Sequence, residues 1–315
     1  MRYLITGGAG FIGSHLSKLL VSEGHEVIVI DDMSTGSVSN LLASGVRLIP
    51  GNMSDESRLR FECQYVDWII HLAATVGVKN TMDKTPQLIK NHIDNTNTIF
   101  KIAAELGKPI FFASTSEAYG NSPEVPFKET TKSVFGSPDV IRWSYGQSKA
   151  IGEALANFYQ NERGLKFVTG RIFNSVGPRQ SGDYGMVLPR FVTSALKQEP
   201  LSVYGSGQQT RSFCHVTDTA NAIYMLTKSP QFGEAYNIGS DNEISILKLA
   251  DTVIKQTRSM SGISFVEYKD AYGLGYEDTN RRVPDTTKIK EHTGWQPQYL
   301  LKDVINDIME EHNGY

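Results

Sequence analysis

Tyr145 and Lys149 have the residue types and the spacing of an acid–base pair. They lie four positions apart in a stretch that reads as helical, so both side chains should project from one face. A lysine ammonium beside a tyrosine favours the phenolate, which would lower the tyrosine pKa toward that of a useful general base. An isolated pair with this spacing could also be an ordinary surface tyrosine and lysine, so other motifs must decide.

A cluster of hydroxyls with one carboxylate, Thr115, Ser116 and Glu117, comes at the end of a predicted buried strand. In doubly wound parallel sheets, strand ends of this kind carry the binding and catalytic groups. A positioned carboxylate could remove or return a proton next to a ketone. Alternatively, Glu117 caps a helix or faces solvent, because carboxylates are common near helix starts.

Glycines at positions 7, 10 and 13 join the first predicted strand to a helix. Gly7 can take the tight turn, Gly10 lets the backbone approach a pyrophosphate, and Gly13 permits close helix packing. The second strand ends in Asp31, 18 residues past Gly13. A carboxylate there can accept hydrogen bonds from the adenosine ribose and disfavours the extra phosphate of NADP, although it could also be only a helix cap. The pattern predicts a dinucleotide site that prefers NAD.

The elements that must position these groups alternate between short apolar runs and amphipathic stretches. The runs read as buried strands and cover Arg2–Thr6, Glu26–Ile30, Val46–Pro50, Trp68–Leu72 and Pro109–Ser114. Strands separated by helices imply right-handed βαβ crossovers and a parallel sheet with helices on both faces. We therefore predict an α/β fold with a Rossmann-type doubly wound parallel sheet.

The pattern changes from about Gly177 onward, with more loops, more polar turns, and isolated helices at Ile244–Thr257 and Leu301–Glu311. We predict an NAD-binding domain over residues 1–176, which also holds the Tyr–Lys pair. A smaller C-terminal α/β substrate-binding domain would cover mainly residues 177–315. The boundary is soft, and strands could be exchanged across it.

Composition argues against several other classes of protein. The 315 residues include 31 basic and 34 acidic ones, a formal net charge of -3, without basic blocks, so no nucleic-acid partner is expected. Cys63 and Cys214 have no metal-ligand spacing, so neither a disulfide framework nor a metal site is indicated. Because no signal-peptide pattern and no apolar run of membrane-spanning length occurs, we expect a cytoplasmic protein with no membrane partner.

Together these motifs resemble the extended short-chain dehydrogenase/reductases, specifically the nucleotide-sugar epimerase, dehydratase and decarboxylase family. The resemblance spans nearly the whole chain. Its further motifs are His71–Ala74, Arg171–Arg179, Tyr204–Gly207, Arg211–Phe213, Tyr236–Gly239, Arg282–Asp285 and Gly294–Trp295. Two departures are Asn52, where an acid is usual, and Asp94–Asn95, where a Gly–Thr pair is usual.

The resemblance implies a role for each matching residue. Tyr145 would take the proton from a sugar hydroxyl while hydride passes to NAD, giving a sugar-4-ketone; Lys149 would hold the cofactor ribose and Thr115 the reacting oxygen. The implied cofactor site consists of Gly7, Gly10, Phe11, Ile12, Gly13, Asp31, Asn52, Met53, Leu72, Ala73, Ala74 and Asn91, with Tyr145 and Lys149.

The resemblance also implies a nucleotide-diphosphate sugar as substrate, a UDP-sugar by expectation, and a homodimer. The implied substrate residues are Arg142, Asn174, Arg179, Val187, Arg190, Tyr204, Arg211 and Arg282. Guanidiniums can fork onto phosphate oxygens, although arginines also form surface salt bridges. The dimer would form through two helices per subunit, near Pro86–Leu106 and Ser144–Arg163.

Glu117 discriminates between the reactions of this family. The 4-epimerases tend to carry a small apolar residue there, whereas decarboxylases and 4,6-dehydratases carry glutamate. The dehydratases place an aspartate before it, but Ser116–Glu117 is the pairing of UDP-glucuronate decarboxylases. We therefore predict a lyase and narrowly favour decarboxylation over 4,6-dehydration, with Ser116 and Glu117 among the catalytic residues.

Other interpretations stay open. Thr75–Lys79 and Gln180–Phe191 look more like the 4-epimerases, of the UDP-glucose or UDP-glucuronate type. Arg142 could pair with a sugar carboxylate or make only a local contact at a helix start. A non-catalytic NAD-binding sensor is an alternative of another class, because fold alone does not fix function. The intact set of Tyr145, Lys149 and Thr115 speaks against it.

Overall fold

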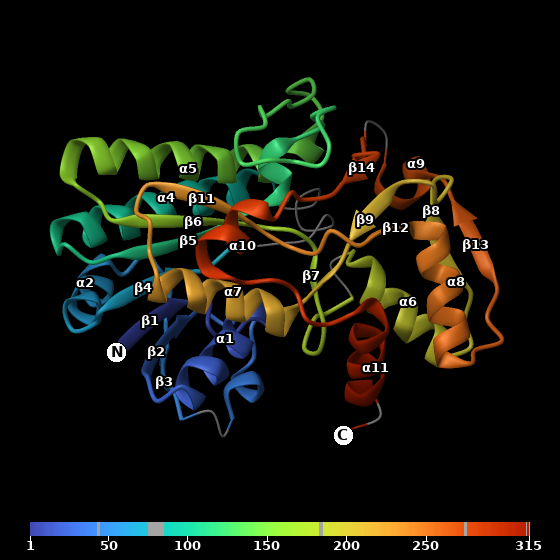
Figure 1. Cartoon of the computed structure of the whole chain (residues 1–315), viewed down its shortest axis with the longest axis horizontal. Helices are drawn as coiled ribbons and strands as arrows, with labels where there is room; N and C mark the ends of the chain where they lie inside the picture. Colours follow the sequence, from blue (N-terminus) through green and yellow to red (C-terminus); the bar gives the residue numbers. More distant parts are fainter. Residues whose placement is uncertain (43–44, 75–84, 183–184, 274–275, 313, 315) are drawn as a thin grey trace.

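A seven-stranded parallel sheet forms the centre of the larger lobe (Figure 1). In this computed structural model, the described residues are 1–42, 45–74, 85–182, 185–273, 276–312 and 314. The strand order is β11-β6-β5-β4-β1-β2-β3, and every neighbouring pair is parallel. The strands are β1 (Arg2–Thr6), β2 (Glu26–Asp31), β3 (Arg47–Pro50), β4 (Trp68–His71), β5 (Ile110–Thr115), β6 (Phe167–Ile172) and β11 (Glu234–Ile238). The predicted doubly wound parallel sheet is confirmed.

The order of the strands reverses between β1 and β4. From β1 the chain adds β2 and β3 on one side, and then β4, β5, β6 and β11 on the other. Crossover connections on either side of such a point leave a crevice at the carboxyl ends of the strands, where ligands of this architecture bind. The glycine loop after β1 and the hydroxyl cluster at the end of β5 both lie at this edge.

Helices cover both faces of the sheet (Figure 1). One face carries α1 (Phe11–Ser22), α7 (Val216–Lys228) and α10 (Thr287–Thr293), and the other carries α2 (Glu56–Gln64), α4 (Thr85–Glu105) and α5 (Ser144–Arg163). Short 3-10 turns are η1 (Val38–Leu41), η2 (Ser116–Tyr119) and η3 (Ile141–Trp143). In the described part of the chain, no helix has both the length and the apolar character needed to span a membrane.

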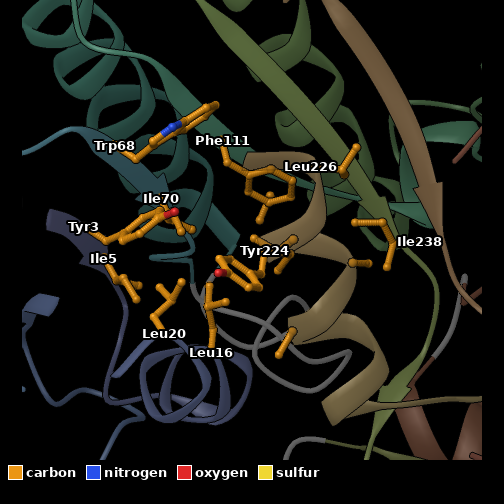
Figure 2. Packing of buried hydrophobic residues seen from close by; sticks show 14 of the residues in the cluster. Tyr3, Ile5, Leu16, Leu20, Trp68, Ile70, Phe111, Tyr224, Leu226 and Ile238 are labelled. Carbon is orange, nitrogen blue, oxygen red and sulfur yellow. The ribbon is translucent and has the colours of Figure 1, made fainter. Parts of the chain in front are cut away.

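Successive side chains of a strand point to opposite faces of the sheet, and both faces of this sheet are buried. On β1, Tyr3 and Ile5 belong to the core beside α1 and α7, with Leu16 and Tyr224 (Figure 2). Leu4, between them, belongs to the separate core under α2, α4 and α5. The near-continuous apolar runs of the sequence therefore correspond to strands covered on both sides.

The smaller lobe has its own core and short sheets. Leu188, Phe191, Leu249, Val253 and Ile305 are fully buried there. Its sheets pair β12-β9-β14, β13-β8 and β10-β7. The elements are β7 (Ser175–Val176), α6 (Val187–Leu196), β8 (Leu201–Tyr204), β9 (Thr210–Ser212), β10 (Cys214–His215), β12 (Glu243–Ser245), α8 (Ile246–Thr257), β13 (Ile263–Val266), α9 (Tyr268–Tyr272), β14 (Arg281–Arg282) and α11 (Leu301–His312).

The chain crosses between the lobes more than once. After β10 it returns to the larger lobe, where α7 packs against α1 and β11 pairs with β6. Segments beyond residue 177 therefore contribute to both lobes. That residues 1–176 bind NAD and residues 177–315 mainly bind the substrate stays a prediction.

Candidate active site

A cavity of about 410 Å³ lies between the lobes at the carboxyl edge of the sheet. Almost all residues expected to bind cofactor or substrate line it. They are Gly7, Gly10, Phe11, Ile12, Gly13, Asp31, Met53, Leu72, Ala73, Ala74, Asn91, Thr115, Ser116, Glu117, Arg142, Tyr145, Lys149, Asn174, Val187, Arg190, Tyr204, Arg211 and Arg282. Residues predicted from motifs that lie far apart in sequence thus meet around one space.

The first turn of the cofactor side is shaped by glycines that no larger residue could replace. Gly7 has φ of +73°, and a Cβ there would lie 2.7 Å from the backbone nitrogen of Ala73. At Gly13 a Cβ would lie 2.3 Å from the Gly7 carbonyl oxygen. Gly10 precedes α1, and no side chain caps that helix. Backbone amides at an uncapped helix N-terminus suit a pyrophosphate, so this loop fits a dinucleotide.

Asp31 braces the same loop from the end of β2. Its carboxylate accepts hydrogen bonds from the backbone N–H groups of Ala9 and Met33, both at 2.9 Å. Burial raises the pKa of Asp31, and these hydrogen bonds oppose that rise. The residue lines the cavity, and its role as a ribose ligand stays a prediction.

The start of α5 packs closely on η2, which brings the reacting groups together. A Cβ at Gly146 would lie 2.3 Å from the carbonyl oxygen of Glu117, so only glycine permits this approach. The Tyr145 hydroxyl forms a hydrogen bond with Thr115. Lys149 is buried, and its ammonium donates to the carbonyl oxygen of Ala113 at 2.8 Å. The arrangement has the parts of an acid–base relay.

The pKa of Tyr145 is raised, whereas the sequence predicted a lowered one. Burial of the hydroxyl and the negative charge of Glu117 both raise it, and the hydrogen bond with Thr115 opposes them. Burial also lowers the pKa of Lys149 to about 8. The prediction was wrong because it counted the lysine charge but neither desolvation nor the nearby carboxylate.

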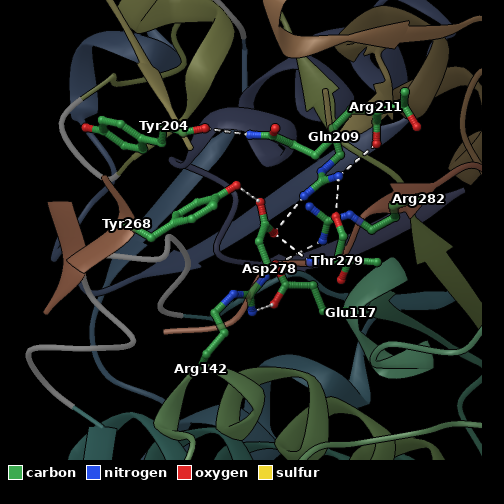
Figure 3. A network of polar contacts seen from close by, with 10 residues as sticks. Glu117, Arg142, Tyr204, Gln209, Arg211, Tyr268, Asp278, Thr279 and Arg282 are labelled. Atoms are coloured by element: carbon green, nitrogen blue, oxygen red, sulfur yellow. Dashed lines mark hydrogen bonds and ion pairs between the residues drawn. The ribbon is translucent and has the colours of Figure 1, made fainter. Parts of the chain in front are cut away.

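Glu117 is held by two arginines (Figure 3). Arg142 donates to both carboxylate oxygens, at 2.5 and 3.1 Å, and Arg282 donates to one of them at 3.1 Å. Burial alone would raise the pKa of Glu117, but the two positive charges outweigh it and hold the pKa at about 2. The side chain is therefore a carboxylate at neutral pH. The alternative of a solvent-facing acid does not apply.

The wall beyond Glu117 carries more positive than negative charge. Arg211 pairs with Asp278 at 2.7 Å and donates to the Thr279 carbonyl at 2.8 Å (Figure 3). Three guanidiniums, those of Arg142, Arg211 and Arg282, thus meet two carboxylates. The Nε atoms of Arg142 and Arg282 are buried without a hydrogen-bond partner in the described structure. All three arginines line the cavity, and their excess of positive charge suits an anionic substrate group, a diphosphate or a carboxylate.

The far end of the cavity is more aromatic. The Arg190 guanidinium lies 4.0 Å from the ring centroid of Tyr204 and donates to the Ser202 carbonyl at 3.0 Å. Asn174 lines the cavity and donates to the Ser212 carbonyl at 2.8 Å. Val187 begins α6 at the same wall.

Two predicted residues are placed elsewhere. Asn52 is exposed and accepts the Ser54 backbone N–H at 3.0 Å, although its neighbours Gly51 and Met53 line the cavity. Arg179 does not line it either; its guanidinium donates to the Asn40 carbonyl at 3.1 Å. Both are polar residues beside site motifs whose side chains bind backbone groups outside the cavity lining: Asn52 a neighbour in sequence, and Arg179 a residue 139 positions away. Thr75–Lys79 lies outside the described residues.

Several lining residues were not predicted, above all a group of tyrosines before Arg282. Tyr268, Tyr272 and Tyr276 line the cavity, and the rings of Tyr272 and Tyr276 stack with centroids 4.3 Å apart. The spacing of Tyr268 and Tyr272 was a readable signal, because it places both side chains on one face of α9. Tyr276 lies past the end of that helix, so the spacing does not explain its position. His92, which stands edge-on to Tyr145 at 5.5 Å, gave no such signal.

Comparison with known proteins gives matches along almost the whole chain. The family model of GDP-mannose 4,6 dehydratase matches residues 4–308. UDP-N-acetyl-alpha-D-glucosaminuronate decarboxylase of Bacillus cytotoxicus is 40% identical, over 98% of this chain and 97% of its own length. UDP-glucuronic acid decarboxylase 1 of Arabidopsis thaliana is 34% identical, over 100% of this chain and 72% of its own length.

Similarity extends to solved structures. A crystal structure of dTDP-glucose 4,6-dehydratase from Streptomyces venezuelae, with NAD and TYD bound, has a TM-score of 0.89 and 27% identity and covers 100% of this chain and 98% of that one. A dehydratase thus shares the fold of a chain whose relatives are named decarboxylases. The reaction must therefore be argued from the site. The chain belongs to the GDP-mannose 4,6 dehydratase family, within the nucleotide-sugar-modifying extended short-chain dehydrogenase/reductases that its motifs resemble.

Proposed function

We propose that this protein is an NAD-dependent lyase that oxidises a UDP-linked hexuronic acid at C4 and releases its carboxyl group as carbon dioxide. The observation that carries the proposal is the ion cluster beside Tyr145. Arg142 and Arg282 hold an ionised Glu117, and both arginines line the cavity. Their guanidiniums could bind the carboxylate of a uronic acid. The relatives named as decarboxylases of two UDP-linked uronic acids support the same reaction.

NAD fits the cofactor side of the cavity. The amides at the start of α1, beside Gly10, would hold the pyrophosphate, and Asp31 would accept from the adenosine ribose hydroxyls. Lys149 would hold the second ribose. When bound, NAD accepts the hydride from C4 of the sugar and supplies it again at the end.

The first step uses Tyr145 and Thr115. Tyr145 takes the proton of the C4 hydroxyl while the C4 hydride departs, and Thr115, hydrogen-bonded to Tyr145, is close enough to bind the same oxygen. Because the pKa of Tyr145 is raised, only a small fraction of the hydroxyl is phenolate at neutral pH. The product of the step is a ketone at C4.

The second step breaks the C5–C6 bond. C6 leaves as carbon dioxide, and the bonding electron pair moves into the C4 ketone as an enolate. C5 then takes up one proton from a donor or from water. C4 takes back the hydride while Tyr145 returns its proton to the C4 oxygen, so a UDP-pentose results. Glu117, with a pKa of about 2, can accept a proton but holds none to give at neutral pH. We assign it the task of orienting Arg142 and Arg282 around the substrate.

The test is incubation of the purified protein with NAD and either UDP-glucuronate or UDP-N-acetylglucosaminuronate. Carbon dioxide release and the sugar product are followed by mass spectrometry and NMR. We expect carbon dioxide and a UDP-linked pentose, and neither with Tyr145→Phe. A C4 epimer of unchanged mass would replace the proposal with 4-epimerisation, and loss of water would replace it with 4,6-dehydration.

We further propose a homodimer formed through α4 and α5. These two helices pack against each other, and α5 exposes the large apolar side chains of Ile151 and Phe158, which are seven positions apart and so share a face. Light scattering in solution tests this: a mass of twice 34.9 kDa is expected. A monomer at micromolar concentration would refute it.

A cytoplasmic location is also proposed. Its support is that Cys63 and Cys214 are both free and buried, as in proteins of reducing compartments. Cell fractionation with an antibody against the protein tests it, and recovery in a membrane or secreted fraction would contradict it.

A further inference from the structure

A buried ion pair lies behind the catalytic groups, outside the set expected to touch cofactor or substrate. Arg171 on β6 donates to both carboxylate oxygens of Glu153 on α5, at 2.6 to 3.1 Å. Only 16% of the arginine side chain and 13% of the glutamate side chain are exposed. Bidentate guanidinium–carboxylate pairs of this kind fix orientation as well as distance.

Glu153 connects the helix and the strand that carry the reacting groups. It lies one turn after Lys149 on α5, so the two side chains share a face of the helix. Its carboxylate also accepts from the hydroxyl of Ser114, the residue before Thr115 on β5. Ser114 and Arg171 are direct partners in the pairing of β5 with β6. One carboxylate thus joins α5, β5 and β6 at the level of the reacting groups.

Arg171 extends the connection toward Glu117. Its guanidinium lies 4.7 Å from the ring centroid of Tyr119, on the same 3-10 turn as Glu117. It also donates to the Glu129 carbonyl at 2.9 Å. The Tyr119 hydroxyl donates to Asn237 at 2.7 Å. Contacts of Tyr119, the last residue of η2, with Arg171 and Asn237 therefore hold the turn that carries Glu117 in place.

Asn237 continues this network to the segment of Arg282. Its side-chain amide donates to the carbonyl oxygens of Phe127 at 2.8 Å and of Asp285 at 3.1 Å. Phe127 in turn donates its backbone N–H to the carbonyl of Val283, the residue after Arg282, at 2.9 Å. The chain of contacts runs from α5 to Val283, the residue next to Arg282, which is one of the two arginines that hold Glu117.

The energetics of buried ion pairs argue for a role beyond stability. Removing two charges from water costs free energy that their attraction often fails to recover, so a well-packed apolar pair would stabilise the fold as well or better. The charge of Glu153 is also felt at Lys149, where it opposes the lowering of the lysine pKa by burial. Geometry and charge at the catalytic lysine thus both depend on this carboxylate.

We infer that Glu153 and Arg171 are positioning residues for the oxidation of the sugar: they hold Lys149 and Tyr145 on α5 in register with Thr115 on β5 and Glu117 on η2. The inference rests on the proposed function for its substrate. It depends only on the first oxidation, which decarboxylation, dehydration and epimerisation share. A displacement of about 1 Å between the reacting groups can slow the oxidation about 100-fold.

The test compares Glu153→Gln with the paired variant Glu153→Leu, Arg171→Met. The first keeps the shape and removes the charge; the second removes both charges, so no buried charge is left unpaired to unfold the protein. For both, we expect kcat and the single-turnover rate of NADH formation to fall about 10- to 100-fold, with KM for the UDP-uronate within about threefold. Thermal unfolding of the paired variant should match that of the wild type.

The matched control is Glu62→Gln, which breaks another pair of a helical glutamate with an arginine, Arg47, at 2.6 Å and outside the cavity lining. It should leave kcat unchanged. Folded variants of Glu153 with kcat within about twofold of the wild type would overturn the inference. Carbon dioxide release reports separately on the proposed function, so a wild type that forms NADH without releasing carbon dioxide would refute that function and still test the positioning role.

Discussion

The two sides of the active site are built in different ways. The loop of the cofactor side is local: Gly7 follows β1, Gly13 lies in the first turn of α1, and Asp31 ends β2. Its shape depends on backbone atoms that approach one another to distances that only glycine allows. The substrate side is assembled from side chains far apart in the sequence, with Glu117 and Arg282 as its two ends.

This difference decides how each side can be damaged. A backbone-built turn is sensitive to volume, because the atoms that a new Cβ meets cannot rotate away. A cluster of buried charges is sensitive to the loss of one charge, because its partners are then left unpaired in a medium of low polarity. Variants of the first kind should affect NAD binding, and variants of the second kind should affect substrate and pH dependence.

The largest effect is expected where the two sides meet, at Tyr145. Tyr145→Phe removes the only hydroxyl assigned to take the sugar proton, so kcat should fall about 10²- to 10⁴-fold while NAD and UDP still bind. Steady-state kinetics and calorimetric titration of both ligands check this. Tyr159→Phe is the control on the same helix: its hydroxyl meets Asn97 at 2.9 Å, outside the cavity lining, and kcat should not change. Full activity of Tyr145→Phe would remove the acid–base assignment.

On the cofactor side, Gly13→Ala should weaken NAD binding on the order of 100-fold, which is the effect expected from overpacking of a few kcal/mol. The added Cβ would lie 2.3 Å from the Gly7 carbonyl oxygen and 2.6 Å from the Gly8 Cα. NAD affinity measured by calorimetry should fall while UDP affinity holds. Gly262→Ala, where no atom lies within 4 Å of the added Cβ, is the neutral control. Equal loss of both affinities would mean that the lobes are not independent.

On the substrate side, Glu117→Gln should lower kcat about 10-fold and move its pH dependence to lower pH. The rate of oxidation rises with pH because the phenolate of Tyr145 is the base, and the charge of Glu117 raises that pKa. Removing the charge of Glu117 lowers the pKa of Tyr145, so the rate begins to rise at a lower pH. Single-turnover NADH formation measured across pH checks the shift. If the rate of the variant rises over the same pH range as that of the wild type, the charge of Glu117 does not affect the pKa of Tyr145.

The fold was largely predictable because strand and helix patterns are local. Five predicted strands correspond to β1–β5 within one or two residues. β6 and β11 were not predicted: Arg171 lies in the first and Asn237 in the second, so polar residues interrupt their apolar runs. Both side chains are satisfied by tertiary contacts, which no local pattern reveals.

The sequence indicated which residues line the site, but not how their charges interact. Motif spacing identified Tyr145, Lys149 and Glu117 as lining residues. It could not show that the ammonium of Lys149 is held by a backbone carbonyl. Nor could it show that Arg282, which follows Glu117 by 165 positions, donates to its carboxylate. Such long-range pairings arise only when the two lobes close around the cavity.

The smallest effect is expected from Asp31→Asn, and its pattern separates two roles. If Asp31 accepts from the adenosine ribose, NAD affinity should fall about 10-fold while NADP affinity holds or rises, because the carboxylate no longer repels the extra phosphate. If Asp31 only braces the loop through Ala9 and Met33, both affinities should fall together. Calorimetric titration with both cofactors decides between them. Asp32→Asn, whose carboxylate accepts only the Ser34 backbone N–H at 2.9 Å among the hydrogen bonds of the described residues, should leave the ratio unchanged. We expect the ratio to shift, because Asp31 lines the cavity at the end of β2, where a ribose ligand is expected.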